Sequence, residues 1–468
     1  MNSSEPKHSP WRIILIVILA LGMLIGISFL PLSKWTKGKV SNINILSDVV
    51  EINTPEYEED ETEMSEDAPL DPCLEEDLAI EVDTREVDTL TITESDKPLI
   101  AVQPSRVGED VIIEDYTESG QGLTNLRNAI KSGSLARIAM VGDSYIEGDI
   151  FAQDLRDMLQ QTYGGNGVGY VNMYSEFPGF RRSVRQGGGK GWKEYRANAK
   201  FDSKHMGITQ HYYKLNSGTE STYQGTSSLG HTKSWNKSTF LFSTPTDAKV
   251  TLTTSEDTVT FDVTGSPDPQ ALVLRGNTSV FKVKTSSPSV IGYGVWLSDS
   301  SGVSLDGMSS RGFSGVTLGA VNSDFTSKTR RFVDYNLIIL EFGINAMSAK
   351  QTNYNGYSEK MIKVIEHLKR CYPNADILVL GIGDRGSKQG SSVHSMAAAS
   401  HMIEAQRQAA RKAHCLFWDT REAMGGEDAI VTWVKNGWAN KDYIHLNHKG
   451  GKQLGELLYK AIKLNIEK

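Results

Sequence analysis

Cysteine is scarce in this sequence: of 468 residues only Cys73, Cys371 and Cys415 are cysteines, and they lie far apart along the chain. A disulfide framework or a zinc site needs clustered ligands, so we expect these thiols to be unpaired and no metal to be bound. An excess of positive charge is also lacking, because the formal net charge is −8 at pH 7. Proteins that bind nucleic acid usually present a basic face, so we expect no nucleic-acid partner.

Charged residues are absent from one long apolar run near the N-terminus, residues 13–30. At ~1.5 Å per residue this run nearly spans a ~30 Å hydrocarbon core, which predicts a single transmembrane helix within an anchor of residues 1–40. A cleaved signal peptide is the alternative, but the run is longer than a usual signal h-region and no small-x-small cleavage site follows it. We expect a bacterial inner-membrane protein that crosses once, with its folded part in the periplasm.

Hydrophobic periodicity is missing from the next segment, residues 41–119, which is dense in Glu and Asp and has few aromatic residues. Such a segment repels itself and cannot bury enough surface to fold alone. The composition predicts a disordered acidic linker that holds the folded part away from the membrane.

Apolar strands alternate with amphipathic helices over residues 120–176 and 300–468. The strands are apolar almost throughout, which is typical of a parallel sheet covered by helices on both faces. These two segments therefore predict one α/β domain with a doubly wound parallel sheet. The expected strands are "ARIAMVGD", "YNLIILEFG", "ADILVLGIGD" and "CLFWDT", and the expected helices are "LTNLRNAIKSG", "IFAQDLRDMLQQTYGG", "YSEKMIKVIEHLKRCYP", "MAAASHMIEAQRQAARKAH" and "GGKQLGELLYKAIK".

Helical periodicity stops between the two α/β segments, at residues 177–299. Short β-rich runs follow one another there, separated by turns rich in Ser, Thr, Gly, Pro and Asp, which is typical of a β-sandwich. We expect an all-β module inserted into the α/β domain. Its expected strands are "KVTLTTS", "TVTFDVTG", "ALVLRG", "VFKVKTS" and "VIGYGVWLSD".

A Gly-Asp-Ser tripeptide, Gly142 to Ser144, follows the first expected strand, and we expect a helix after it. In doubly wound folds ligands bind beyond the carboxyl ends of the strands, and a helix N-terminus offers N–H groups to an anion, so the position suits a catalytic serine. For the tripeptide alone, a turn with a helix cap is the alternative. The segment is not a Gly-x-Ser-x-Gly elbow, because Ile146 takes the place of the second glycine.

A serine nucleophile needs a base to take its proton and a carboxylate to orient that base. Asp442 and His445 stand three positions apart before the last expected helix, a spacing that lets the carboxylate reach the imidazole Nδ1. His448 is the competing base, but it lacks an acidic residue at the same upstream offset. Asn345 and the backbone N–H of Gly315 are candidate oxyanion donors. Taken alone, Gly315 also fits a plain turn and Asn345 a helix cap.

The segments around Ser144, Gly315, Asn345 and His445 together resemble the four blocks of the SGNH (GDSL-type) hydrolase superfamily. The resemblance implies a flavodoxin-like three-layer fold that needs no cofactor. It implies Ser144 as nucleophile, His445 as base, Asp442 as the residue that orients the base, and an oxyanion hole formed by Ser144, Gly315 and Asn345.

More narrowly, "GDSYIEGD" and "WANKDYIHLNHKGG" are similar to periplasmic peptidoglycan O-acetylesterases, which carry a β-sandwich carbohydrate-binding-like module inside the catalytic domain. Ala346 departs from the superfamily, in which an acidic residue commonly follows the asparagine. Asp149 matches an acidic position of the subfamily, but the sequence does not reveal its role.

The resemblance implies a membrane-anchored serine esterase that removes O-acetyl groups from an envelope glycan, with peptidoglycan as the expected substrate. An O-acetyltransferase acting on an envelope polysaccharide and a catalytically silent glycan-binding protein remain alternatives. In the inserted module, Trp192, Tyr195 and Arg182 are candidate substrate-binding residues, because rings stack on sugars and a guanidinium holds acidic groups. The alternative is that the rings fill the sandwich core and the charge is solvated. The sequence does not determine the oligomeric state.

Overall fold

The computed structural model describes residues 106–107, 110–390 and 392–468. The expected membrane anchor, most of the expected acidic linker and Cys73 lie outside the described residues. Cys371 and Cys415 are buried free thiols. No helix in the described part of the chain combines the length and the apolar character needed to cross a membrane.

A six-stranded sheet forms the centre of the α/β part, in the strand order β16-β4-β17-β18-β21-β3. Five of its strands are parallel, and β3 pairs antiparallel at one edge. Numbered along the chain, the parallel strands lie in the order 2-1-3-4-5, which is the flavodoxin-like order. The predicted α/β class is confirmed. The strands are β3 (Glu114–Asp115), β4 (Ala136–Gly142), β16 (Val303–Ser309), β17 (Leu337–Glu341), β18 (Asp376–Leu380) and β21 (Leu416–Trp418).

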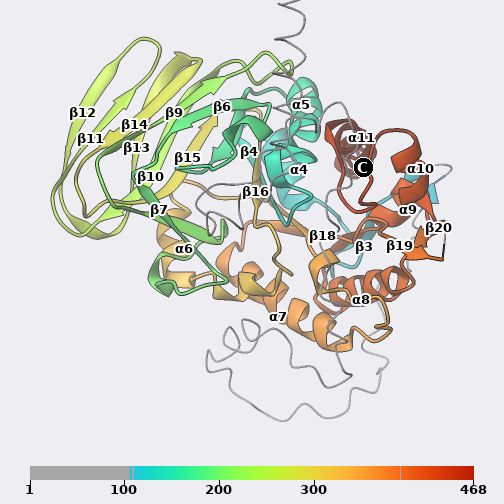
Figure 1. The fold of residues 1–468 in the computed structure, drawn as a ribbon. Helices are drawn as coiled ribbons and strands as arrows, with labels where there is room; N and C mark the ends of the chain where they lie inside the picture. The colour runs from blue at the N-terminus through green and yellow to red at the C-terminus, as the bar shows by residue number, and fades with distance from the viewer. Residues whose placement is uncertain (1–105, 108–109, 391) are drawn as a thin grey trace, which may run out of the picture. The chain divides into compact units, whose positions relative to one another are not determined.

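Helices lie on both sides of this sheet, with α4, α5 and α11 on one side and α7 and α8 on the other (Figure 1). The helices are α4 (Thr124–Lys131), α5 (Ala152–Tyr163), α6 (Ser323–Thr329), α7 (Asn355–Cys371), α8 (Ala398–Lys412), α9 (Thr420–Met424), α10 (Ala429–Lys435) and α11 (His448–Ile466). Short 3-10 helices are η2 (Glu147–Asp149), η3 (Pro178–Phe180), η4 (Ser203–His205), η5 (Val316–Ala320) and η6 (Ile344–Ala346). Two small antiparallel pairs join β1 (Arg106–Val107) to β2 (Asp110–Val111) and β19 (Gly386–Gln389) to β20 (Ser392–Ser395).

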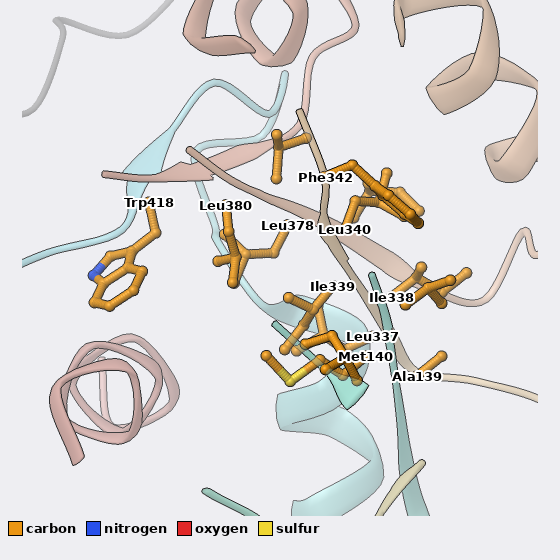
Figure 2. Packing of buried hydrophobic residues seen from close by; sticks show 14 of the residues in the cluster. Ala139, Met140, Leu337, Ile338, Ile339, Leu340, Phe342, Leu378, Leu380 and Trp418 are labelled. Carbon is orange, nitrogen blue, oxygen red and sulfur yellow. The ribbon is translucent and has the colours of Figure 1, made fainter. Parts of the chain in front are cut away.

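The central strands are buried on both faces, which explains their continuous apolar sequence. The four residues from Leu337 to Leu340 are each at most 1% exposed, and Figure 2 shows them packed with neighbours from other strands. Alternate residues of a strand point to opposite faces, so burial of all four requires a covering layer on each side. Helical layers on both faces supply that cover.

The β-rich region forms two antiparallel sheets, seen on the left of Figure 1. One has the order β13-β10-β15-β8-β7 with β5 also paired to β15, and the other has the order β12-β11-β14-β9-β6. The predicted runs form β11 to β15, whereas β5 lies before the expected start of the module at residue 177. The strands are β5 (Gly167–Val171), β6 (Val184–Gly188), β7 (Trp192–Arg196), β8 (His211–Leu215), β9 (Thr219–Gly225), β10 (Trp235–Thr244), β11 (Ala248–Thr253), β12 (Thr258–Val263), β13 (Ser266–Thr278), β14 (Val280–Thr285) and β15 (Ile291–Ser298).

Strand β10 shows how these sheets meet the α/β part. Phe240 and Phe242 belong to the hydrophobic core between the two antiparallel sheets, whereas Leu241 belongs to the larger core of the α/β part. This is the alternation that a strand buried on both faces requires. Buried polar groups support the same contact: Arg137 of β4 pairs with Asp306 at 3.1 Å and donates to Ser298 Oγ of β15 at 3.3 Å. The six-stranded antiparallel sheet therefore packs directly on the α/β part.

Candidate active site

Three neighbouring parallel strands end at the same level and bring their following loops together. In the register of the sheet, Gly142 of β4 lies opposite Ser309 of β16 and Glu341 of β17. The loop after β4 is held to both neighbours, because Asp143 N donates to Glu341 O at 3.2 Å and Ser309 Oγ donates to Asp143 O at 2.8 Å. Ser144 therefore lies at the carboxyl edge of the sheet, where ligands of such folds bind.

The helix after Ser144, predicted to begin at Ile150, begins close to that residue. A turn and the 3-10 helix η2 come first, and α5 starts at Ala152. Gly148 and Asp149 have φ of 63° and 65°, which are left-handed values that interrupt a right-handed helix. A side chain at position 148 would also meet the Phe180 ring at 2.4 Å. A turn and η2 therefore separate Ser144 from the N-terminus of α5 along the chain.

Ser144, His445 and Asp442 form a hydrogen-bonded series. Ser144 Oγ lies 3.0 Å from His445 Nε2, and His445 Nδ1 lies 2.8 Å from Asp442 Oδ2. Partial burial favours the neutral acid, but hydrogen bonds from the His445 side chain and from the N–H groups of Ile444 and His445 together lower the pKa of Asp442. An ionised Asp442 keeps the proton on Nδ1 and leaves Nε2 as the acceptor for the serine hydroxyl.

A tyrosine links the serine loop to the histidine loop. The Tyr145 hydroxyl donates to the Ile444 carbonyl at 2.8 Å, and the Tyr145 ring is 2% exposed. Because Tyr145 and Ile444 directly adjoin Ser144 and His445, this bond ties the two loops that carry the reacting groups. Tyr145 was not predicted as a site residue, and its position beside Ser144 is its one signal in the sequence.

The competing base, His448, lies elsewhere. It is the first residue of α11, and its Nδ1 is 2.9 Å from Gln153 Nε2 of α5. Asn447 caps α11, since its side chain accepts from the N–H groups of Lys449 and Gly450. This cap turns the chain between the two histidines, so that His445 reaches the serine and His448 contacts α5.

Asn345 and Gly315 lie in the loops after the two flanking strands. Asn345 Nδ2 donates to Asp143 Oδ2 at 2.9 Å and to Phe313 O at 3.1 Å, so it joins both loops to the Gly-Asp-Ser turn. Gly315 has φ of 93°, and a Cβ there would lie 2.9 Å from the Phe342 side chain. The left-handed backbone and the close ring both require glycine at position 315.

A pair of buried carboxyl groups supports this arrangement. Burial raises the pKa of Asp143 to about 6 and raises the pKa of Glu341 well above its usual value. Asp143 Oδ1 also accepts from Tyr145 N at 3.1 Å. Ala346 carries no acidic group, and Glu341 at the end of β17 supplies a second buried acid beside Asp143. Glu341 was not predicted as a site residue, although it is the single charged residue in "YNLIILEFG".

Asp149, whose role the sequence left open, is the centre of a buried ion network. Its carboxylate accepts two bonds of 2.7 Å from Arg156 of α5, lies 3.2 Å from Arg181, and accepts from Ser183 Oγ at 2.6 Å. Arg181 in turn donates to the carbonyls of Tyr170 and Val168 in β5. Asp149 thus joins the loop after Ser144 to the antiparallel sheets.

The three candidate substrate-binding residues do not share one surface. Trp192 is 4% exposed in the core between the antiparallel sheets, and its Nε1 donates to Ser221 Oγ at 3.1 Å. Tyr195, on the other face of β7, stacks on Tyr212 with a centroid distance of 5.2 Å. Arg182 is exposed before β6. Of the three, Trp192 alone lines the cavity next to the Ser144 loop.

Metal ligation by acidic, histidine and cysteine side chains needs at least three of them grouped together. Over the ranges that the structure describes, no three of them are grouped so as to hold a metal ion. The polar groups at the carboxyl edge of the sheet are instead arranged as a hydroxyl, an imidazole and a carboxylate in series, with an amide beside them. That arrangement suits transfer of an acyl group.

Among the comparisons with known proteins, similarity to a solved structure supports the fold of this chain. No family model matches the sequence, and no curated protein matches it. A solved structure described as "Peptidoglycan O-acetylesterase in action, 5 min" is similar with a TM-score of 0.63 and 22% identity, over 76% of this chain and 99% of that chain. An acetyl xylan esterase (TM-score 0.26, 19% identity, 34% of this chain and 81% of that chain) and a family two carbohydrate esterase from Cellvibrio japonicus (TM-score 0.26, 8% identity, 60% and 99%) are too distant to carry an argument. The chain has the fold of the first structure and resembles the SGNH (GDSL-type) hydrolases.

Proposed function

We propose that this chain is a serine esterase that removes O-acetyl groups from an envelope glycan. The observation that carries the proposal is the series of contacts from Ser144 Oγ to His445 Nε2 and from His445 Nδ1 to Asp442 Oδ2, of 3.0 and 2.8 Å. A serine hydroxyl placed on the acceptor nitrogen of an imidazole, with an ionised carboxylate behind it, is an activated nucleophile.

In the proposed reaction, Ser144 Oγ bonds to the acetyl carbon while its proton passes to His445 Nε2. The bond from the acetyl carbon to the sugar oxygen then breaks, and the sugar oxygen takes the proton from His445. A water molecule attacks the acetyl-serine and gives its proton to His445. Acetate leaves as Ser144 Oγ regains that proton, so each step of proton transfer uses the same imidazole.

Negative charge develops on the acetyl oxygen in both steps and needs fixed donors. We assign this role to the backbone N–H groups of Ser144 and Gly315 and to the Asn345 amide. One Asn345 N–H donates to the buried Asp143 carboxyl, and the other donates to the Phe313 carbonyl. In the proposed reaction, the second N–H leaves the Phe313 carbonyl and donates to the oxyanion. The Asp143 bond keeps the amide in place during that exchange.

The substrate and the location are the finer part of the proposal. We assign peptidoglycan as the glycan, because the sequence motifs resemble those of peptidoglycan O-acetylesterases and because the solved structure with a TM-score of 0.63 is described as such an enzyme. The uncharged run at residues 13–30 supports attachment to the inner membrane, with the α/β part in the periplasm.

The test uses the full chain purified in detergent. Acetate release is measured from O-acetylated peptidoglycan and from p-nitrophenyl acetate, with and without an N-acetylglucosamine oligosaccharide as acceptor. We expect release from both substrates, with no acetylated oligosaccharide formed. Acetyl transfer to the oligosaccharide would identify an O-acetyltransferase, and no turnover of either substrate would favour a silent glycan-binding protein.

A further inference from the structure

A cavity of about 480 Å³ opens beside the serine loop. Its walls come from Ile146 to Asp149 after Ser144, from the segment 174–178 that leads into η3, and from β7 and β8 of the antiparallel sheet. Its volume falls within the ~300–1,000 Å³ typical of small-molecule sites. The α/β part and the antiparallel sheet therefore enclose one space, and one wall of it directly continues the catalytic turn.

The rim of this cavity carries exposed aromatic rings. Phe177 is 72% exposed and Phe180 is 45% exposed, and both line the cavity. Among the described residues, five large hydrophobic side chains are exposed, and Phe177 and Phe180 are the two aromatic ones. Flat apolar rings at the mouth of a polar cavity offer stacking surfaces to the C–H face of a sugar ring.

The floor carries a buried polar group that lacks a partner. His211 of β8 is 5% exposed, and its Nδ1 has no hydrogen-bond partner among the described residues. The nearest carboxylate, Glu194, lies 4.0 Å away, beyond hydrogen-bond distance. Burial lowers the pKa of His211 to about 4, so the ring is neutral at physiological pH and offers one donor and one acceptor. A buried polar group without a partner is unfavourable and is usually explained by a ligand or water that completes it.

The charges around the cavity are mixed. Glu147, Glu176 and Glu194 line it together with Arg196 and Arg311, and Arg311 pairs with Glu147 at 3.3 Å. A lining that contains both carboxylates and guanidinium groups suits hydroxyl and amide groups, which donate and accept, better than it suits a polyanion.

We propose that this cavity binds the pyranose rings of the glycan next to the acetylated sugar, with Phe177 and Phe180 stacking on a ring and His211 binding a hydroxyl or amide group at the floor. The inference rests on the proposed function and names its sugar-binding site. It places substrate recognition in the segment that joins β5 to β6, not in the exposed face of the antiparallel sheets.

Binding is tested separately from catalysis, in full-length protein that carries Ser144→Ala. Isothermal titration with the trisaccharide of N-acetylglucosamine measures affinity, and xylotriose serves as a second probe that lacks the N-acetyl group. We expect Phe177→Ala and Phe180→Ala each to weaken trisaccharide binding about tenfold, the effect of losing one aromatic contact. Val259→Ala, which also trims an exposed apolar residue, lies on β12 away from the cavity and is the matched control.

Equal affinity in the Phe177→Ala and Val259→Ala proteins, or no binding of either trisaccharide, would overturn the inference. Stronger binding of the N-acetylglucosamine trisaccharide than of xylotriose supports an amino-sugar glycan, and the reverse order supports a plain pyranose polymer in the same site. Failure of the proposed function has a different signature: the Ser144→Ala chain would hydrolyse p-nitrophenyl acetate, a substrate that needs no sugar site, as fast as the unchanged chain.

Discussion

Two buried carboxyl groups stand on either side of the Ser144 turn, and they differ in charge state. Asp143 is fully buried, and burial raises its pKa to about 6. Asp149 is buried to a similar degree, but the charges of Arg156 and Arg181 outweigh the effect of burial and lower its pKa. Equal burial thus produces opposite shifts, and a buried cation decides the sign.

The difference in charge state indicates that the regions around Asp149 and Asp143 have different roles. The region around Asp149 fastens the serine loop to α5 and to β5 through ionised groups that stay paired. The region around Asp143 contains a second acid, Glu341, and holds Asn345 through a carboxyl group that can change its protonation near neutral pH. We therefore expect changes at Asp149 to affect folding, and changes at Asp143 and Glu341 to affect the site and its pH response.

The largest expected effect comes from Ser144, which lies between the two regions. Ser144→Ala should lower kcat for p-nitrophenyl acetate by ~10⁴–10⁶, because removal of a nucleophile from such a triad leaves only binding and oxyanion stabilisation. Its midpoint of urea unfolding should stay close to that of the unchanged chain, since the hydroxyl contributes little to packing. Residual activity above a tenth of normal would contradict the assignment. Ser228→Ala, an exposed serine in the turn after β9, is the control.

Removing a cation from the Asp149 region should destabilise the fold. Arg156→Met leaves the Asp149 carboxylate with less compensation in a buried site, which typically costs ~3–5 kcal/mol. Urea unfolding measures the loss, and Arg275→Met, at an exposed arginine on β13, should change the free energy of unfolding by no more than ~0.5 kcal/mol. The double variant Asp149→Asn with Arg156→Met should recover part of the stability. A loss equal to that of the control would show that the network is not needed for folding.

On the Asp143 side, Asn345→Ala should act on turnover. We expect kcat to fall by roughly 10²–10³ with KM nearly unchanged, because an oxyanion donor acts mainly in the transition state. Asn353→Ala, in the loop before α7, is the control and should leave both constants unchanged. A rise in KM alone would make Asn345 a substrate-binding residue and would remove it from the oxyanion hole.

The smallest expected effect is a change in how stability depends on pH. Glu341 keeps its proton in the folded chain at pH values where the unfolded chain has lost it, because its folded pKa is raised. The unfolded state then binds fewer protons, so the free energy of unfolding falls as pH rises above the unfolded pKa, by up to ~1.4 kcal/mol per pH unit for one proton. Glu341→Gln should make this decline shallower between pH 5 and 7, measured by urea unfolding. Glu256→Gln, at an exposed turn, should leave the slope unchanged.

Acidification should affect the Asp149 region in the opposite sense. The pKa of Asp149 is lowered in the folded chain, so its contribution to stability is present above the unfolded pKa and is lost as pH falls toward the folded one. In an Asp149→Asn chain the free energy of unfolding should therefore fall less steeply below pH 4 than in the unchanged chain. Parallel curves would show that Asp149 has the same pKa in both states.

Much of the α/β part follows from local sequence. Strands β4, β17 and β18 are continuous apolar runs, and α7 and α8 have an apolar stripe at helical spacing, so each element could be recognised from its own residues. Strand β16 is harder to recognise, because the apolar–polar alternation of "VSLDGMS" lasts only four residues before Gly307, and pairing with β4 holds the strand in the sheet. The strand β10 was also missed, since its polar beginning, "WNKST", hides the apolar half.

The sequence by itself determined strands β4, β17, β18 and β21 and the candidate series of Ser144, His445 and Asp442, because hydrophobic period and short spacings are local properties. Only the tertiary structure decided which histidine meets the serine, since a cap at Asn447 and a bond from Tyr145 to Ile444 separate His445 from His448. It also decided that Asp149 is a paired anion and that Trp192 is a core residue. Those outcomes depend on contacts between residues far apart in the chain, which no local pattern records.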